Sequence, residues 1–153
     1  MLIKTPYARK RPEVYASFFR GRRGDRRADY RDFDERNIER LILYHNPACS
    51  HSRGALELLN GRGVEFETIE YLKTPPTRAD LESIIAILEE PVADLVRKDK
   101  RFGELKLKAE DYTAREPVID LLLKHPELIQ RPIVIRKRRA IIARPAEKLS
   151  ALF

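Results

Sequence analysis

A single cysteine, Cys49, is present in the 153 residues, and the chain has no tryptophan and only three histidines. One cysteine excludes an intrachain disulfide framework and a zinc site built from several cysteines, so thiol exchange needs a second thiol from another molecule. No apolar run reaches the roughly 18 to 20 residues of a membrane-spanning helix, and no apolar segment typical of a secretion signal follows the basic start. These absences predict a cytoplasmic protein with no membrane partner.

The basic excess of the chain is concentrated at its start. Lysine and arginine outnumber aspartate and glutamate by 31 to 24, and residues 1–40 hold 12 basic and 7 acidic residues, which is +5 of the total net charge of +7. Arginine clusters with interspersed glycines and no apolar periodicity predict a basic, flexible arm over residues 1–38. Periodic apolar segments predict one globular domain over residues 39–153.

The basic arm has three alternative interpretations. Its arginines suit contact with nucleic-acid phosphates, a targeting segment is also arginine-rich, and a translation start further along the chain would remove the arm. Acidic side chains count against a targeting segment, which is poor in them: Asp25, Asp29, Asp32, Asp34 and Glu35. We do not expect nucleic acid to be a partner.

The segments after residue 40 predict a βαβ unit. Residues 41–44 form a short apolar run that ends at turn-forming residues, and residues 64–71 alternate loosely as a second strand would. Residues 50–60 between them have helical apolar spacing, with Gly61 at the position of a C-terminal capping glycine. A strand, a helix and a parallel strand in this order are normally connected with a right-handed crossover.

Three helices are predicted in the middle of the chain. Thr77 and Asp80 have the spacing of an N-terminal capping box before a helix whose apolar residues are Leu81, Ile84, Ile85 and Leu88. Pro91 can open a second helix, with Val92, Leu95 and Val96 on one face. A third helix is predicted over residues 115–125, beginning at a capping box of Thr113 and Glu116 and ending at Pro126. Its apolar face consists of Ile119, Leu122 and Leu123.

The end of the chain predicts a hairpin and a terminal helix. Residues 132–135 and 140–143 have the composition of two strands, and Pro145 begins the helix. The turn between the strands is basic, with Arg136, Lys137, Arg138 and Arg139. We interpret this turn as a solvated basic tip, with a partner-binding surface as the alternative.

Cys49 directly precedes the predicted helix at 50–60, so its sulfur is expected at a helix N-terminus. Unpaired backbone N–H groups and the helix dipole favour an anion there, which lowers the pKa of a thiol and makes it a nucleophile near neutral pH. The same N–H groups, with Ser52 and Arg53 as side-chain donors, can hold an incoming oxyanion. His45 either places an imidazolium near the sulfur or only ends the strand, and the sequence favours neither.

The segment around Cys49 resembles a known active-site loop. HNPACSHSR at residues 45–53 is similar to the loop of the glutaredoxin-coupled arsenate reductases. Four further blocks are similar to the family in the same order: YLKTPPTR at 71–78, LVRK at 95–98, RPIVI at 131–135 and RPAE at 144–147. The resemblance covers about residues 41–151 without a gap.

The resemblance implies an α/β, thioredoxin-like fold, a mixed four-stranded sheet with a helical insertion between the βαβ half and the C-terminal hairpin and helix. It implies that Cys49 attacks arsenate while Arg97, Arg131 and Arg144 bind the oxyanion, a task suited to the planar, permanently charged guanidinium. It also implies a cis peptide between Arg131 and Pro132. Residues with substrate-binding or thiolate-activating roles are expected in the loop itself: His45, Asn46, Ser52 and Arg53.

The implied activity is the reduction of arsenate to arsenite through a Cys49–arsenic adduct. Glutathione is the expected reducing co-substrate and glutaredoxin the expected partner, with no metal and no tightly bound cofactor. Ser50 and His51 replace the Gly-Thr pair common in the family. This difference bears on which oxyanion is the substrate more than on the predicted fold.

Two further functions are compatible with the sequence. One is a glutathione-linked thiol oxidoreductase that acts on another oxyanion or on protein mixed disulfides, although a disulfide substrate would not need three arginines. The second is a non-enzymatic redox regulator that binds RNA polymerase. Related regulators use a Cys-x-x-Cys switch, whose second position is Ser52 here.

Overall fold

The computed structural model describes residues 41–153, so the predicted arm and its boundary at residue 38 lie outside the described residues. The strands are β1 (Leu41–His45), β2 (Phe66–Glu70), β3 (Ile133–Arg136) and β4 (Arg139–Ile142). The α-helices are α3 (Ser50–Gly61), α4 (Arg78–Ile87), α5 (Lys100–Glu104) and α6 (Arg115–Lys124). Short 3₁₀ helices are labelled η: η2 (Val92–Leu95), η3 (Ala109–Asp111), η4 (Pro126–Leu128) and η5 (Ala146–Leu152).

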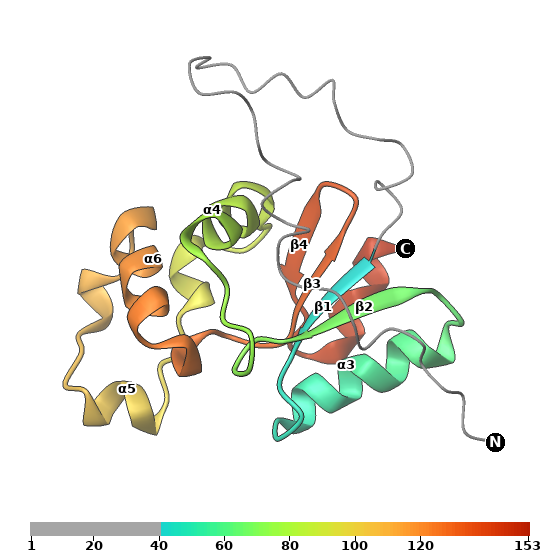
Figure 1. Ribbon diagram of the computed structural model, residues 1–153, viewed down its shortest axis with the longest axis horizontal. Helices are drawn as coiled ribbons and strands as arrows, with labels where there is room; N and C mark the ends of the chain where they lie inside the picture. Colours follow the sequence, from blue (N-terminus) through green and yellow to red (C-terminus); the bar gives the residue numbers. More distant parts are fainter. Residues whose placement is uncertain (1–40) are drawn as a thin grey trace, which may run out of the picture.

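The four strands form one mixed sheet in the order β2-β1-β3-β4. β1 pairs in parallel with β2 and antiparallel with β3, and β3 pairs antiparallel with β4. The predicted βαβ unit is thus β1–α3–β2, and the predicted hairpin is β3–β4. The helical segments between these halves lie together to one side of the sheet (Figure 1). The architecture confirms the predicted thioredoxin-like fold with a helical insertion.

Apolar side chains cover both faces of the sheet. On one face, buried residues of the sheet such as Leu43 and Val134 pack with Ala55 and Leu59 of α3 and with Leu149 of η5. On the other face, the helical insertion contributes most of the buried side chains, among them Leu81, Ile84, Val118, Ile119 and Leu122. Burying one such side chain stabilises the fold by about 1.5–3 kcal/mol, so each face holds its layer of helices in place.

The first helix ends differently from the prediction. Gly61 is still helical, Arg62 is the C-terminal cap with an ordinary right-handed φ of −81°, and Gly63 follows with a φ of +65°. Positive φ is the conformation that favours glycine. The glycine that turns the chain out of α3 is therefore Gly63, and the prediction of Gly61 as the cap was wrong.

The insertion begins as predicted. The Thr77 side chain accepts a hydrogen bond from the backbone N–H of Asp80, whose carboxylate accepts one from the backbone N–H of Thr77. This reciprocal pair is the predicted capping box of α4. The segment after Pro91 is a 3₁₀ helix, η2, and Val96 lies beyond it, in an isolated antiparallel bridge with Ile129.

Two features of the insertion differ from the sequence prediction. The N-cap of α6 is Ala114, which makes no side-chain capping bond, so the capping box of Thr113 and Glu116 is absent. Leu123 was predicted on the buried face of this helix but is 36% exposed. Sequence patterns also did not indicate α5, which is capped by Asp99, whose carboxylate accepts hydrogen bonds from the backbone N–H groups of Arg101 and Phe102.

The basic turn between β3 and β4 is not simply a solvated tip. Arg136 donates to the backbone carbonyl of Leu152 at 2.9 Å, and its guanidinium lies 4.3 Å from the centre of the Phe153 ring. Arg139 donates to the carbonyl of Ala151 at 2.6 Å. Two of the four basic side chains thus hold the last residues, which form the 3₁₀ helix η5 rather than an α-helix.

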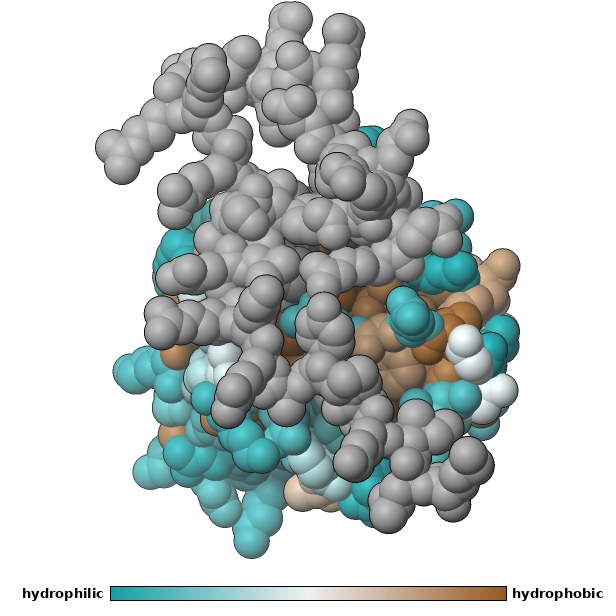
Figure 2. Space-filling model, turned by 45° about the vertical axis from the view of Figure 1, so that its right-hand side comes forward, coloured by the Kyte–Doolittle hydropathy of each residue, from teal (hydrophilic) through white to brown (hydrophobic). Residues whose placement is uncertain are grey.

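One face of the molecule is seen in Figure 2, where hydrophilic residues fill the lower left and apolar residues gather toward the right. The large apolar side chains that stay exposed are Leu58, Leu72, Leu123 and Phe153. In residues 41–153 no helix has both the length and the apolar character needed to span a membrane.

Candidate active site

Cys49 is the N-cap of α3, as the sequence predicts. β1 ends at His45, and the chain then turns back so that the backbone N–H of Cys49 donates to the carbonyl of Asn46 at 3.0 Å. The side-chain oxygen of Asn46 accepts from the backbone N–H of Ala48 at 3.0 Å, which fixes the same turn. Cys49 has extended backbone angles (φ −97°, ψ 123°), and its carbonyl accepts from the N–H of Arg53. The sulfur is consequently held at the positive end of the helix, half-exposed.

The surroundings of Cys49 favour the thiolate. Burial by itself raises the pKa of the thiol, but hydrogen bonds from the backbone N–H groups of Ser52 and His51 and from the side chain of Arg131 lower it. The lowering effects win, so the pKa of Cys49 lies below its ordinary value. Stabilisation of an anionic sulfur by helix N-terminal N–H groups and a cation is the arrangement found at reactive cysteines.

His45 and Ser52 meet beneath the loop. Nδ1 of His45 lies 2.7 Å from Oγ of Ser52, and the same hydroxyl accepts from the backbone N–H of Asn46 at 3.0 Å. Both side chains are buried, and burial is the largest of the effects that lower the pKa of His45. A neutral imidazole is therefore favoured, which speaks against the alternative of an imidazolium beside the sulfur. Ser52 points inward, so it meets Cys49 through its backbone N–H rather than its hydroxyl.

Arg53 holds the outer side of the loop. Its guanidinium donates to the carbonyl of Pro47 at 3.0 Å and is exposed.

The side chains of the other two histidines are not among the groups that lower the pKa of Cys49. His51 is exposed as predicted. His125 is the C-cap of α6, and its ring lies 3.2 Å from the carboxylate of Glu127. Residues 41–153 contain no group of three or more His, Cys, Asp or Glu side chains placed to hold a metal ion.

Four polar residues lie just beyond the ends of the four strands. His45 pairs with Glu70 and Tyr44 with Ile133, so continuing the ladders places Tyr71 and Arg131 on either side of Asn46. Ile133 pairs with Ile142, and the backbone N–H of Ala143 donates to the carbonyl of Pro132; Arg144 follows, where its own N–H turns back to the carbonyl of Ile142. Tyr71, Asn46 and Arg131 lie together, because the side chains of Asn46 and Arg131 both act on the Tyr71 hydroxyl. We call Tyr71, Asn46, Arg131 and Arg144 the polar row.

Several polar atoms in the polar row lack a partner. Arg131 is buried, and one of its terminal nitrogens donates to the carbonyl of Glu127 at 3.2 Å. The buried Nε of Arg131, one terminal nitrogen of Arg144 and the hydroxyl of Tyr71 have no hydrogen-bond partner among the described residues. Burial raises the pKa of Tyr71 despite the nearby Arg131 and Asn46 side chains. A buried polar group without a partner is costly, so these atoms are candidates to bind a ligand or a water molecule.

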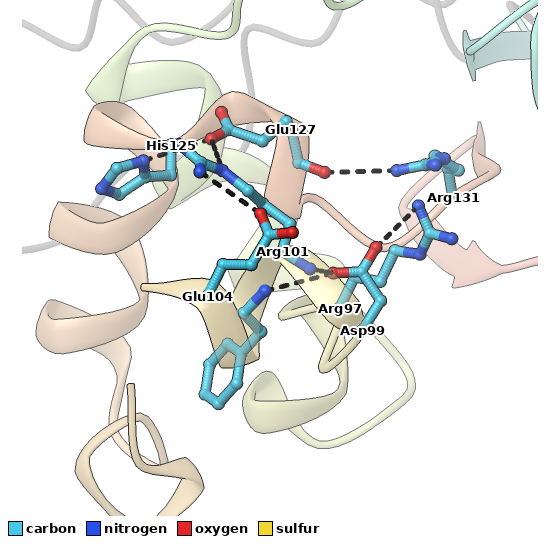
Figure 3. A network of polar contacts seen from close by, with 8 residues as sticks. Arg97, Asp99, Arg101, Glu104, His125, Glu127 and Arg131 are labelled. Carbon is cyan, nitrogen blue, oxygen red and sulfur yellow. Dashed lines mark hydrogen bonds and ion pairs between the residues drawn. The ribbon is translucent and has the colours of Figure 1, made fainter. Parts of the chain in front are cut away.

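Arg97 reaches this region through the insertion. The N–H of Arg97 donates to the carbonyl of Leu128, and the N–H of Gln130 donates to the carbonyl of Leu95, so the two segments lie antiparallel around the Val96–Ile129 bridge. The guanidinium of Arg97 is 3.1 Å from the carboxylate of Asp99 and lies on the same side of the polar network as Arg131 (Figure 3). Its neighbour in the resting protein is thus the N-cap of α5, an element that sequence reasoning missed.

The site as a whole combines a thiolate with cations and unpaired donors. Arg131 contributes to the lowered pKa of Cys49, and the side chain of Arg97 lies on the same side of the polar network as Arg131 (Figure 3). The Arg131–Pro132 peptide is cis as predicted, and the Arg144–Pro145 peptide is also cis. Sequence reasoning did not identify Tyr71 as a site residue, because its place beside Asn46 follows from strand register and not from the loop motif.

Comparison with known proteins identifies relatives of this architecture. A family model described as the ArsC family matches residues 44–152. The chain is 42% identical over 111 residues to an arsenate reductase of Escherichia coli (strain K12), covering 72% of this chain and 78% of the relative. It is 41% identical over 108 residues to an arsenate reductase of Rhizobium meliloti (strain 1021), covering 70% of this chain and 76% of the relative. A solved arsenate reductase from Vibrio cholerae superposes with a TM-score of 0.67 at 32% identity, covering 75% of this chain and 98% of that structure.

Proposed function

Because the chain belongs to the ArsC family, whose curated relatives include arsenate reductases, we propose that it reduces arsenate to arsenite with Cys49 as the nucleophile. The observation that carries this proposal is the buried Arg131 beside the Cys49 thiolate, with no carboxylate paired to it in residues 41–153. Arg144 also pairs with no carboxylate among these residues, and one of its terminal nitrogens is buried without a partner. A buried cation without a counterion is costly, so this arrangement favours a bound anion. A bound oxyanion would neutralise both.

The chemistry begins with attack of the Cys49 thiolate on arsenic(V). The S–As bond forms, an As–O bond breaks, and the oxygen leaves as water after taking up protons. Arg131 and Arg144, with Arg97 entering from the insertion, stabilise the charge that redistributes over the remaining oxygens. The unpaired Tyr71 hydroxyl and Arg131 Nε supply further hydrogen-bond donors in the same place.

The reducing electrons come from a second thiol, because the chain has no other cysteine. Glutathione thiolate attacks the Cys49 sulfur, an S–S bond forms and the S–As bond breaks with its electron pair going to arsenic, which leaves as arsenite. Arsenic gains two electrons, and the two thiols lose two as they become a mixed disulfide. A glutaredoxin thiolate then takes the glutathionyl group and restores the Cys49 thiolate.

A coupled assay tests the proposal. Arsenate-dependent NADPH oxidation is measured with glutathione, glutathione reductase and glutaredoxin, and in parallel with thioredoxin and thioredoxin reductase. We expect activity in the glutaredoxin arm, its loss in Cys49→Ser, a strong decrease in Arg97→Ala, and little change in the control Arg115→Ala, an exposed arginine of α6. Activity in the thioredoxin arm alone would overturn the proposed reductant. A folded parent protein inactive in both arms would overturn arsenate as the substrate.

A further inference from the structure

Asp99 is a carboxylate that the chemistry proposed at Cys49 does not use. It is the N-cap of α5, and its Oδ1 accepts hydrogen bonds from the backbone N–H groups of Arg101 at 3.1 Å and Phe102 at 3.3 Å. Its other oxygen, Oδ2, lies 3.1 Å from a terminal nitrogen of Arg97 (Figure 3). One carboxylate thus joins the start of a helix to an arginine proposed to bind the oxyanion.

The ion pair with Asp99 leaves most of the Arg97 guanidinium unused. A guanidinium carries five N–H donors in a planar fork, and this ion pair engages only one terminal nitrogen. In residues 41–153 the guanidinium has no other ion-pair or hydrogen-bond partner. Arg97 is therefore held on one side while its remaining donors stay open to a ligand.

The backbone of Arg97 is fixed as well as its side chain. The N–H of Arg97 donates to the carbonyl of Leu128 at 2.7 Å. The next side chain, Lys98, turns back to donate to the carbonyl of Ala93 at 2.9 Å, so it does not compete for Asp99. Ordering a free arginine side chain on binding costs rotamer entropy. With both ends fixed, much of this ordering is complete before a ligand arrives.

The helix that Asp99 caps also reaches the second arginine of the site. Nε of Arg101 in α5 donates to the carboxylate of Glu127 at 3.2 Å. The backbone carbonyl of Glu127 accepts from a terminal nitrogen of Arg131 at 3.2 Å (Figure 3). Arg97 and Arg131 are therefore held in part by contacts that lead back to the same short helix.

Asp99 has two opposite effects on an anion at Arg97. Its negative charge repels the anion, whereas its hold on the guanidinium favours binding by orientation. The Arg97 and Asp99 side chains are 30% and 27% exposed, so water and salt reach the pair and screen the repulsion. Orientation is not screened in this way. We therefore expect the favourable effect to be the larger one.

We propose that Asp99 is a positioning residue, which holds the guanidinium of Arg97 in the orientation that binds the oxyanion. This role rests on the proposed function, in which Arg97 contributes to the arsenate site. Asp99 itself does not touch the substrate. Loss of its carboxylate should weaken oxyanion binding, although it removes a negative charge from the neighbourhood of an anion.

Two substitutions separate this role from the capping of α5. Asparagine and serine are both good N-cap residues, so Asp99→Asn and Asp99→Ser should keep the helix, but neither offers a carboxylate to Arg97. Asp120→Asn is the matched control, because it removes another carboxylate of the insertion, one that pairs with Arg78. Circular dichroism of each variant checks that the protein is folded.

The measurement is the protection of Cys49 from iodoacetamide by arsenate, in the full chain, at constant ionic strength and without a reductant. It reports oxyanion binding and needs no turnover. The half-protecting concentration should rise about tenfold in both Asp99 variants, the factor expected for losing one charge-assisted hydrogen bond, and should not rise in Asp120→Asn. Without arsenate the alkylation rate should stay the same, because Asp99 is not among the groups that act on the thiol.

A double-mutant cycle shows whether Asp99 acts through Arg97. Arg97→Ala should itself raise the half-protecting concentration, and adding Asp99→Asn to it should cause no further rise. Independent effects would add instead. An equal rise from Asp99→Asn in the parent and in the Arg97→Ala background would overturn the proposal.

The remaining outcomes separate this role from the proposed function. A lower or unchanged half-protecting concentration in the Asp99 variants would overturn the proposal, because Asp99 would then compete with the oxyanion or only cap α5. Failure of arsenate to protect the parent protein would overturn both the oxyanion site and the role of Asp99. Protection that depends on Asp99 through Arg97, in a protein that forms no arsenite, would support the role of Asp99 and overturn the proposed reduction.

Discussion

His45 and Ser52 are joined across the Cys49 loop, with Nδ1 of the imidazole 2.7 Å from Oγ of the serine. The hydroxyl also accepts from the backbone N–H of Asn46, so one buried side chain ties the end of β1 to the first turn of α3. The sulfur is thus positioned by contacts within the protein before any substrate binds. Preorganisation of this kind lowers the cost of orienting a nucleophile.

Ser52→Ala should destabilise the protein. It leaves the buried N–H of Asn46 and Nδ1 of His45 without their partner, and an unsatisfied buried group costs about 1–3 kcal/mol. Urea denaturation of both proteins measures the difference in the free energy of unfolding. Ser150→Ala is the control, because the only hydrogen bond of the Ser150 hydroxyl in the described residues is one it accepts from the exposed Arg62. Equal losses for the two variants would contradict the role assigned to Ser52.

The stability of the protein should depend on the protonation of His45. Burial lowers the pKa of this residue in the folded state, so below the unfolded value of about 6.5 the unfolded chain binds more protons. The free energy of unfolding therefore falls as pH decreases through and below this value, and should fall less in His45→Asn. Thermal denaturation of the two proteins from pH 8 to pH 5 compares the profiles. Parallel profiles would exclude His45 as the group that titrates.

The reactivity of Cys49 should persist below the ordinary thiol pKa of about 8.5. Arg131 is one of the groups that lower the pKa of this thiol, so Arg131→Gln should move the pH profile of alkylation by iodoacetamide to higher pH. Arg115→Gln should leave the profile in place. Circular dichroism on the same samples confirms folding. An unchanged profile in a folded Arg131→Gln protein would show that this arginine does not stabilise the thiolate.

Tyr71→Phe should leave the free energy of unfolding unchanged or raise it. The buried hydroxyl has no hydrogen-bond partner in residues 41–153, and removing such a group relieves a penalty of about 1–3 kcal/mol. The KM for arsenate should rise, because the hydroxyl is among the donors proposed for the oxyanion. A variant that loses more than about 1 kcal/mol of stability would mean that the hydroxyl has a partner in the folded chain.

Local patterns predicted the elements that local interactions build. The capping box of α4 needs only Thr77 and Asp80, and the position of Cys49 at a helix N-terminus follows from its immediate neighbours. The prediction failed where a distant contact decides the conformation. Arg136 and Arg139 look like an isolated basic turn in the sequence, but the last residues of the chain supply their acceptors.

The polar row was not predictable as a unit for the same reason. Its members come from four segments that the sheet brings to its edge, where Asn46 and Arg131 reach the Tyr71 hydroxyl. The sequence resemblance pointed to the arginines individually, whereas the lack of carboxylate partners for Arg131 and Arg144 in residues 41–153 is a property of the folded chain. The position of Arg97 depends in addition on Asp99 and α5, which carried no helical signal in the sequence.

The most direct test of the central claim measures arsenite and the state of Cys49 in one reaction. The purified parent protein and Cys49→Ser are each incubated with arsenate and glutathione, without glutaredoxin. Arsenite is quantified, and the intact mass of the protein is recorded. The account predicts up to one arsenite per parent chain, with one glutathionyl group added at Cys49 only when arsenate is present, and neither product from Cys49→Ser. Arsenite formed at the parent level by Cys49→Ser would contradict it.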